Sequence, residues 1–169
     1  MAEQRTGAGE AATDVILSIF RANGLLLGGG DLLSASEGLT SARWQVMGAI
    51  ALAERPLTVP QIARRMGLTR QSVHATVKRL TADGLVEPAP NPDHLRSQLI
   101  GLTELGDRRY AAIDRRQIRW VNDLARGITL SDLETTARVL EELAARLEAE
   151  DQSKPNPKGS DGHATPRDG

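Results

Sequence analysis

The chain has 169 residues, a length that fits one domain of ordinary size with short tails. Apolar residues make up 40% and aromatic residues only 2%, so we expect a core of aliphatic side chains. The chain contains no cysteine, which excludes disulfides, thiolate metal sites and thiol-based redox sensing. The net charge is −1, so a nucleic-acid partner has to be inferred from how the charge is distributed.

The sequence carries no obvious targeting signal. No run of apolar residues approaches the roughly 18 residues of a membrane span. The N-terminus lacks a basic start leading into an apolar run, so it does not resemble a secretory signal. We therefore expect a cytoplasmic protein without a membrane partner.

The N-terminal part predicts two helices. Apolar residues at helical spacing indicate a first helix over about residues 11–33, after a frayed tail of residues 1–10. The run 28–30 is three glycines and is expected to weaken or bend that helix, at about 1 kcal/mol for each glycine. Thr40 is then the predicted N-cap of a second helix that carries Trp44 and Met47 on one side.

The next segment has the pattern of a helix-turn-helix. Thr58 is a predicted N-cap, and Gln61 three residues later completes a capping box. Gly67 is placed to end this helix in a left-handed conformation. Thr69 then caps another helix, which packs through Val73, Val77 and Leu80 and ends near residues 83–84. Two short helices joined by a turn that contains glycine are typical of this motif.

A hairpin is predicted to follow. Residues 85–87 are expected to form a short strand, and residues 98–102 its partner. Between them, residues 88–93 include three prolines, which exclude a helix and suit a hairpin tip. A helix pair followed by a hairpin indicates a winged helix.

The C-terminal part predicts two more helices. One begins at about Thr103 and carries Ile113 and Trp120, and the other runs from Ser131 to about Glu150 with an apolar seam. The seam offers more apolar surface than one small winged domain needs. Serine, proline, glycine and aspartate dominate residues 151–169, which we expect to be disordered.

The helix-turn-helix and hairpin are a basic module within an acidic chain. Between Pro56 and Leu102 there are six basic and three acidic residues, a net charge of +3 against −1 for the whole chain. A phosphate backbone attracts such a concentration of positive charge. We therefore expect duplex DNA as a partner.

The helix after Thr69 is the expected DNA-reading element. If its apolar residues face inward, its polar residues lie on the opposite side, and its first turn reaches deepest into a major groove. Gln71 suits the edge of adenine, and Arg70 suits guanine or a phosphate. The candidate DNA-binding residues, including two on the hairpin, are Thr69, Arg70, Gln71, Ser72, His74, Ala75, Lys78, Arg79, His94 and Arg96.

Four short motifs resemble the MarR family of transcriptional regulators over roughly Ala11 to Glu150. The order and spacing of the motifs are more specific than any one of them. They are Gly38-Leu39-Thr40-x-x-Arg43-Trp44, Leu68-Thr69-Arg70-Gln71-Ser72-Val73, Leu80-x-x-x-Gly84-Leu85-Val86 and Leu102-Thr103-x-x-Gly106.

The resemblance implies a mainly α fold with a small β-wing. It implies a winged helix-turn-helix over about 41–103, with dimerisation helices over about 11–33 and 104–150. It also implies a homodimer that binds a pseudo-palindromic operator, with half-sites about 10 bp apart. Members of the family often carry an aspartate two residues before the arginine at the wing tip, where this chain has His94. Without that aspartate, Arg96 is expected to be held less rigidly. His94, when protonated, is expected to contact a phosphate itself.

The resemblance also implies a repressor that is relieved by a small aromatic or anionic effector. Candidate effector-binding residues are Arg43, Trp44, Tyr110 and Trp120, although aromatic residues at helical spacing more often belong to a core. The alternative function is a winged-helix module that binds proteins and not DNA.

An enzyme is not expected. The three histidines are scattered along the chain, and the glycine run lacks the residues of a phosphate-binding loop. The sequence suggests no catalytic residues, no cofactor and no metal site.

Overall fold

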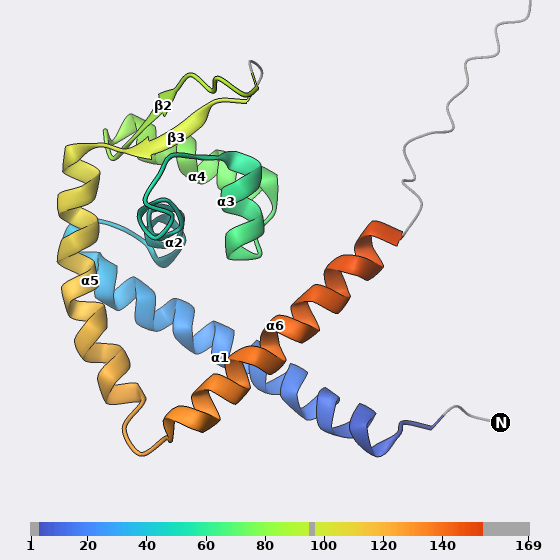
Figure 1. The fold of residues 1–169 in the computed structure, drawn as a ribbon. Coiled ribbons are helices and arrows are strands. Elements are labelled where there is room, and N and C mark those ends of the chain that lie inside the picture. Colours follow the sequence, from blue (N-terminus) through green and yellow to red (C-terminus); the bar gives the residue numbers. More distant parts are fainter. Residues whose placement is uncertain (1–3, 95–96, 154–169) are drawn as a thin grey trace, which may run out of the picture. The chain divides into compact units, whose positions relative to one another are not determined.

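The structure is a computed structural model, and it describes residues 4–94 and 97–153. It consists of helices and one small sheet (Figure 1). The chain divides into two compact units between Val121 and Asn122. In chain order the elements are α1 (Gly7–Ser34), the short 3₁₀ helix η1 (Ala35–Glu37), α2 (Ser41–Ala51), β1 (Leu57–Thr58), α3 (Val59–Met66), α4 (Arg70–Ala82), β2 (Val86–Ala89), β3 (Leu99–Leu102), α5 (Glu104–Leu124) and α6 (Leu130–Ser153).

α1 is one uninterrupted helix that continues through the glycine run. The reason is close packing on one side of the helix. A Cβ atom on Gly29 would lie 2.9 Å from Cζ2 of Trp120, and one on Gly30 would lie 2.6 Å from Oγ of Ser41. Glycine therefore lets α2 and α5 approach the α1 backbone, and these contacts offset the poor helix propensity of glycine.

The helix-turn-helix is built by local hydrogen bonds, as the sequence predicts. The Thr58 backbone N–H donates to Oε1 of Gln61 (2.8 Å), and the Gln61 N–H donates to the Thr58 hydroxyl (3.4 Å), which completes the capping box of α3. Gly67 ends α3 with a φ of 61°, in the left-handed region. The hydroxyl of Thr69 then accepts from the Ser72 N–H (3.1 Å) and begins α4.

The sheet has three antiparallel strands in the order β1-β3-β2. β2 and β3 form the predicted hairpin, but β2 extends to Ala89 and takes in two residues predicted to lie in the tip. Pro88 is tolerated because β2 is an edge strand. β1 was not predicted: Leu57 pairs with Ile100, and Thr58 pairs with Leu99.

The core of the first unit lies between α2, α3, α4, the sheet and α5. Its members are aliphatic, as the composition indicates, and they include the inward-facing positions predicted for α4. The fully buried residues with the largest side chains are Val46, Met47, Ile62, Val73, Leu80, Val86 and Ile113.

The start of α5 is fixed to the end of α4 by backbone contacts. The Thr103 N–H donates to the Leu85 carbonyl (3.1 Å), and the Thr103 hydroxyl donates to the Gly84 carbonyl (2.7 Å). Gly106 is buried directly against this turn, and a Cβ atom there would lie 2.0 Å from the Leu85 carbonyl oxygen. The glycine in the Leu102-Thr103-x-x-Gly106 motif is thus a packing requirement.

The second unit contains α6. The Thr129 hydroxyl accepts from the Asp132 N–H (3.2 Å) at the start of this helix. Several large apolar side chains of α6 are exposed: Leu133, Val139, Leu140 and Leu147.

Several boundaries differ from those predicted. α1 begins at Gly7, so residues 7–10 are helical and do not belong to a tail. α6 ends at Ser153, so residues 151–153 are helical as well, and residues 154–169 of the predicted C-terminal tail lie outside the described residues. A capping Thr6 hydroxyl, which accepts from the Gly9 N–H (3.1 Å), explains the earlier start of α1.

The segment Gly7–Glu37 is, by length and composition alone, apolar enough to cross a membrane. The sequence prediction counted only uninterrupted apolar runs and did not identify it. A helix that packs against protein can pass the same test, so the criterion does not distinguish between the two environments. Several of its large apolar side chains are exposed, among them Phe20, Leu25 and Leu32.

Candidate nucleic-acid interface and effector pocket

α4 separates its apolar and polar residues onto different faces. Val73, Val77 and Leu80 are buried in the core. All eight candidate DNA-binding residues from Thr69 through Arg79 are exposed. The described part of the protein therefore leaves the predicted reading face free, with Arg70 and Gln71 in the first turn of the helix.

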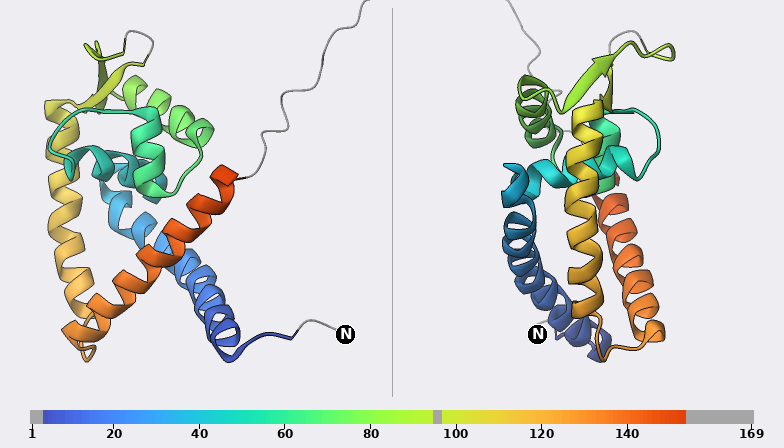
Figure 2. Two further views of the ribbon diagram at one scale, coloured as in Figure 1. Left: turned by 45° about the vertical axis from the view of Figure 1, so that its right-hand side comes forward. Right: turned by 90° about the vertical axis from the view of Figure 1, so that its left-hand side faces the viewer.

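The hairpin of β2 and β3, the wing, extends beside α4 (Figure 2). A groove of about 520 Å³ separates the two. His74 and Lys78 line it from α4, while Pro88 and Gln98 line it from the hairpin side. The groove thus places a cationic side chain between the helix and the wing.

The structure describes one of the two candidate DNA-binding residues of the hairpin, His94 and Arg96. His94 is exposed near the end of the wing. Its neighbour Asp93 donates its backbone N–H to Oδ1 of Asn91 (3.1 Å), which stabilises the proline-rich turn. Arg96 lies outside the described residues.

Arg43 is engaged in structural contacts. It forms an ion pair with Asp83, the residue after α4, and donates to the Gly38 carbonyl (3.3 Å). Its side chain is 17% exposed. Arg43 thus ties α2 to the end of α4. It does not line the pocket between α2, α3 and α5 that contains Trp44.

A pocket of about 250 Å³ lies between α2, α3 and α5. It brings together two of the four predicted effector residues, Trp44 and Tyr110. The Tyr110 ring packs on α2 at Gly48, where an added Cβ atom would make an ordinary van der Waals contact of 3.5 Å with the ring. The lining residues are Trp44, Gln45, Gly48, Leu52, Met66, Tyr110, Asp114 and Gln117.

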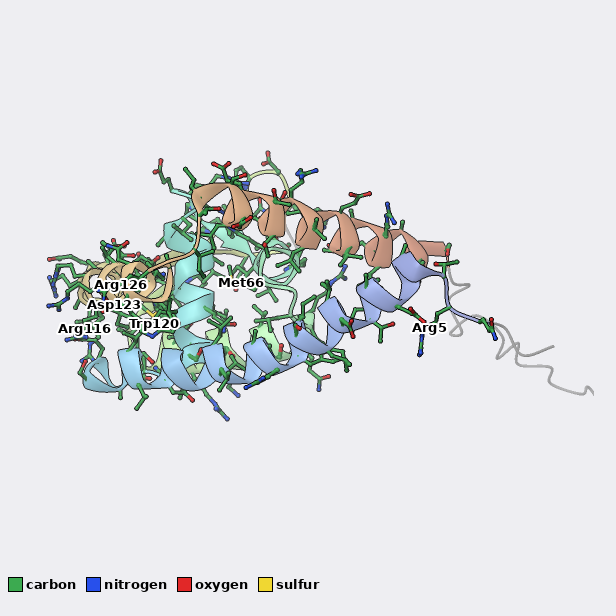
Figure 3. The ribbon with its side chains drawn as sticks, turned by 90° about the horizontal axis from the view of Figure 1, so that it is seen from below. Arg5, Met66, Arg116, Trp120, Asp123 and Arg126 are labelled. Atoms are coloured by element: carbon green, nitrogen blue, oxygen red, sulfur yellow. The ribbon has the colours of Figure 1, made fainter. Side chains whose placement is uncertain are left out.

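Trp120 does not line this pocket. Its indole ring packs against Gly29, so it joins α5 to α1, as Figure 3 shows for the part of α5 that faces α1. On the same helix, Arg116 donates to the carboxylate of Glu37 (3.1 Å), and Arg109 donates to the Glu37 backbone carbonyl. These contacts hold α5 against η1 and the end of α1.

Sequence reasoning missed Asp114 and Gln117 as pocket residues. The signal that could have identified them is helical spacing, since Asp114 is four residues after Tyr110 on the same helix. Burial, together with the charge of Asp114, raises the pKa of Tyr110 above its ordinary value of 10.0. The Trp44 indole N–H is buried and has no hydrogen-bond partner among the residues that the structure describes.

The arrangement of possible metal ligands in residues 4–94 and 97–153 does not indicate a metal site. Within them, no group of three or more histidine, cysteine, aspartate or glutamate residues could hold a metal ion.

The helix-turn-helix, the hairpin after it and the exposed face of α4 define a winged-helix protein of the DNA-binding type. A sequence profile of the MarR family matches residues 37–97. An uncharacterized protein of Mycobacterium tuberculosis is 40% identical over 136 residues, which cover 80% of this chain and 94% of that protein. The chain belongs to the MarR family of transcriptional regulators.

Other proteins are similar to the chain in sequence or in fold. The transcriptional activatory protein BadR of Rhodopseudomonas palustris is 25% identical over 137 residues, covering 78% of this chain and 77% of BadR. A MarR/EmrR family regulator from Acinetobacter shares the fold with a TM-score of 0.71 and 22% identity, covering 85% of this chain and 99% of that structure. CouR of Rhodococcus jostii, solved with p-coumaroyl-CoA bound, has a TM-score of 0.64 and 23% identity, covering 79% of this chain and 93% of that structure.

Proposed function

We propose that the protein is a cytoplasmic homodimer that binds a pseudo-palindromic operator in duplex DNA. The observation that carries this proposal is the exposed face of α4, with the wing beside it. An exposed helix of this kind fits the major groove, and two copies related by a two-fold axis read two half-sites about one helical turn apart.

The residues on this surface have distinct proposed roles. Arg70 and Gln71 read base edges, because guanidinium and amide groups pair in two places with guanine and adenine. Lys78 and Arg79 contact phosphates, which supplies affinity without sequence preference. Thr69, Ser72, His74 and Ala75 complete the helix surface, and His94 and Arg96 provide the contacts of the wing.

Exposed apolar side chains support a dimer. They occur on α1, α5 and α6, the helices outside the winged module. Large apolar side chains exposed in this number are uncommon in a monomer and are usually covered by another chain. Large examples are Phe20 at 70%, Leu32 at 83%, Ile118 at 49% and Leu147 at 65% exposure.

We further propose that a small effector binds the pocket between α2, α3 and α5 and relieves repression. The pocket joins α5 to the helix-turn-helix, so a ligand there contacts both the winged module and one of the proposed dimerisation helices. CouR, a protein of the same fold, was solved with p-coumaroyl-CoA. Because BadR is named as an activatory protein, activation is the second candidate for the sign of regulation.

The direct test is selection of bound sequences from random duplex DNA, followed by titration of the selected site. We expect a pseudo-palindrome. Arg70→Ala and Gln71→Ala are expected to weaken binding to this site by about 1–3 kcal/mol each and to leave the dimer intact. Arg119→Ala, which removes an exposed arginine of α5, is the matched control.

Two outcomes would contradict the DNA-binding proposal. One is unchanged affinity in both α4 variants. The other is the absence of DNA binding at low salt, which would favour the alternative of a protein-binding module. A reporter gene placed under the selected site then decides between repression and activation.

Truncation before Leu133 tests the dimer. We expect the shortened chain to sediment as a monomer and to lose affinity for the full operator. A truncated chain that still sediments as a dimer would show that α6 is not part of the interface.

A further inference from the structure

The pocket between α2, α3 and α5 has one charged residue in its lining, Asp114. The residues around it are aromatic, apolar or amide side chains. Trp44 and Tyr110 supply two aromatic rings, while Leu52 and Met66 supply apolar surface. The pocket therefore presents a carboxylate together with aromatic faces.

Five arginines are next in sequence to a lining residue, and four of them have partners within the described residues. Arg43 pairs with Asp83, and Arg116 pairs with Glu37. Arg109 donates to a backbone carbonyl of η1, and Arg65 donates to the backbone carbonyl of the lining residue Leu52 (3.3 Å). The fifth, Arg115, is exposed and forms no ion pair among the described residues. None of these cations lines the pocket.

Asp114 itself has no ion-pair partner among the residues that the structure describes. Its side chain is only partly exposed. A carboxylate in such a position gains from a cation that replaces part of its lost hydration. A carboxylate ligand would instead meet a like charge in the same small space.

We propose that the pocket binds a small organic cation, an ammonium or amidinium group attached to a single aromatic ring. The cationic group pairs with Asp114, and the aromatic body packs against Trp44, Tyr110 and Met66. Cations of this kind are also attracted to the faces of aromatic rings. A volume of about 250 Å³ limits the ligand to about one ring with a short side chain.

This inference rests on the proposed effector function and specifies its chemistry. It replaces the anionic effector that the family resemblance suggests with a cationic one. The reason is local, because the lining of the pocket within the described residues contains a carboxylate and no cation.

The test uses three probes of nearly equal size that differ in charge: phenethylammonium, phenylacetate and phenethyl alcohol. Binding to the full chain is measured by calorimetry in the absence of DNA. We expect phenethylammonium to bind about tenfold more tightly than the alcohol, and phenylacetate to bind more weakly than both. Asp114→Asn should remove about tenfold from the affinity for the cation alone. Asp107→Asn, which neutralises a carboxylate of the same helix outside this pocket, is the matched control.

Equal or tighter binding of phenylacetate would overturn the proposal. Unchanged cation affinity in Asp114→Asn would also overturn it, as would the absence of binding by all three probes. The operator titration is made separately on the same samples. The two proposals can therefore fail separately, because the operator titration tests DNA binding and the calorimetry tests the cation site.

Discussion

Substitution of Gly106 by alanine is expected to destabilise the protein strongly. The added Cβ atom would lie 2.0 Å from the Leu85 carbonyl oxygen and 3.0 Å from the Leu85 carbonyl carbon. Both neighbours are backbone atoms, so no side chain can rotate away. The start of α5 has to move from the turn after α4, and this strains the hydrogen bond from Thr103 to Leu85 (3.1 Å).

The magnitude follows from two contributions. Overpacking of a fixed site costs about 1–3 kcal/mol, and a weakened hydrogen bond costs about 1 kcal/mol. We therefore expect Gly106→Ala to lower the free energy of unfolding by about 2–4 kcal/mol. Urea unfolding followed by circular dichroism, at a fixed protein concentration, measures this change.

Gly24→Ala is the matched control. Gly24 lies inside α1, and nothing in the described structure lies within 4 Å of an added Cβ atom. Because alanine is the better helix former, this variant is expected to gain stability, by up to about 1 kcal/mol. If both variants have the same stability, the close contact at Gly106 is not what selects glycine there.

Three further predictions concern the α3 cap, the pocket and the DNA surface. Thr58→Ala removes the hydroxyl that caps α3 and is expected to cost about 1 kcal/mol in urea unfolding, with unchanged stability arguing against the capping box. Tyr110 is the single tyrosine of the chain, so its phenolate absorbance in a pH titration should show a pKa above 10.0 in the folded protein, and Asp114→Asn should lower that value. Because the pKa of Tyr110 is raised in the folded state, its neutral phenol contributes to the free energy of unfolding. That contribution is fully present below pH 10.0 and is lost as the pH rises through the folded pKa. Constant stability across that range would contradict the raised pKa. Lys78→Ala should reduce the magnitude of the slope of log affinity against log salt concentration by about 1 for each phosphate contact that is lost. An unchanged slope would show that this side chain contacts no phosphate.

The helix-turn-helix could be predicted from sequence because its determinants are local. The Thr58–Gln61 capping box and the Thr69 cap each join residues three positions apart. Gly67 adopts the left-handed conformation that its place at a helix end predicts. The two faces of α4 follow from helical periodicity alone.

The effector pocket could be predicted only in part, because it depends on contacts between residues far apart in the chain. Of the four candidate residues, Trp44 and Tyr110 line it. Arg43 forms an ion pair with Asp83, forty positions away, and Trp120 packs on Gly29. No local pattern indicates which of these side chains is already engaged.

The amino-acid sequence by itself determined where most of the helices begin and end and which face of α4 carries the polar residues, since those features arise from interactions within one or two helical turns. Tertiary structure alone decided that α1 continues through its glycines and that β1 joins the sheet. It also decided that Gly106 has no room for a side chain. In each of these cases the deciding energy comes from a surface supplied by a distant part of the chain, and local propensity contains no information about that surface.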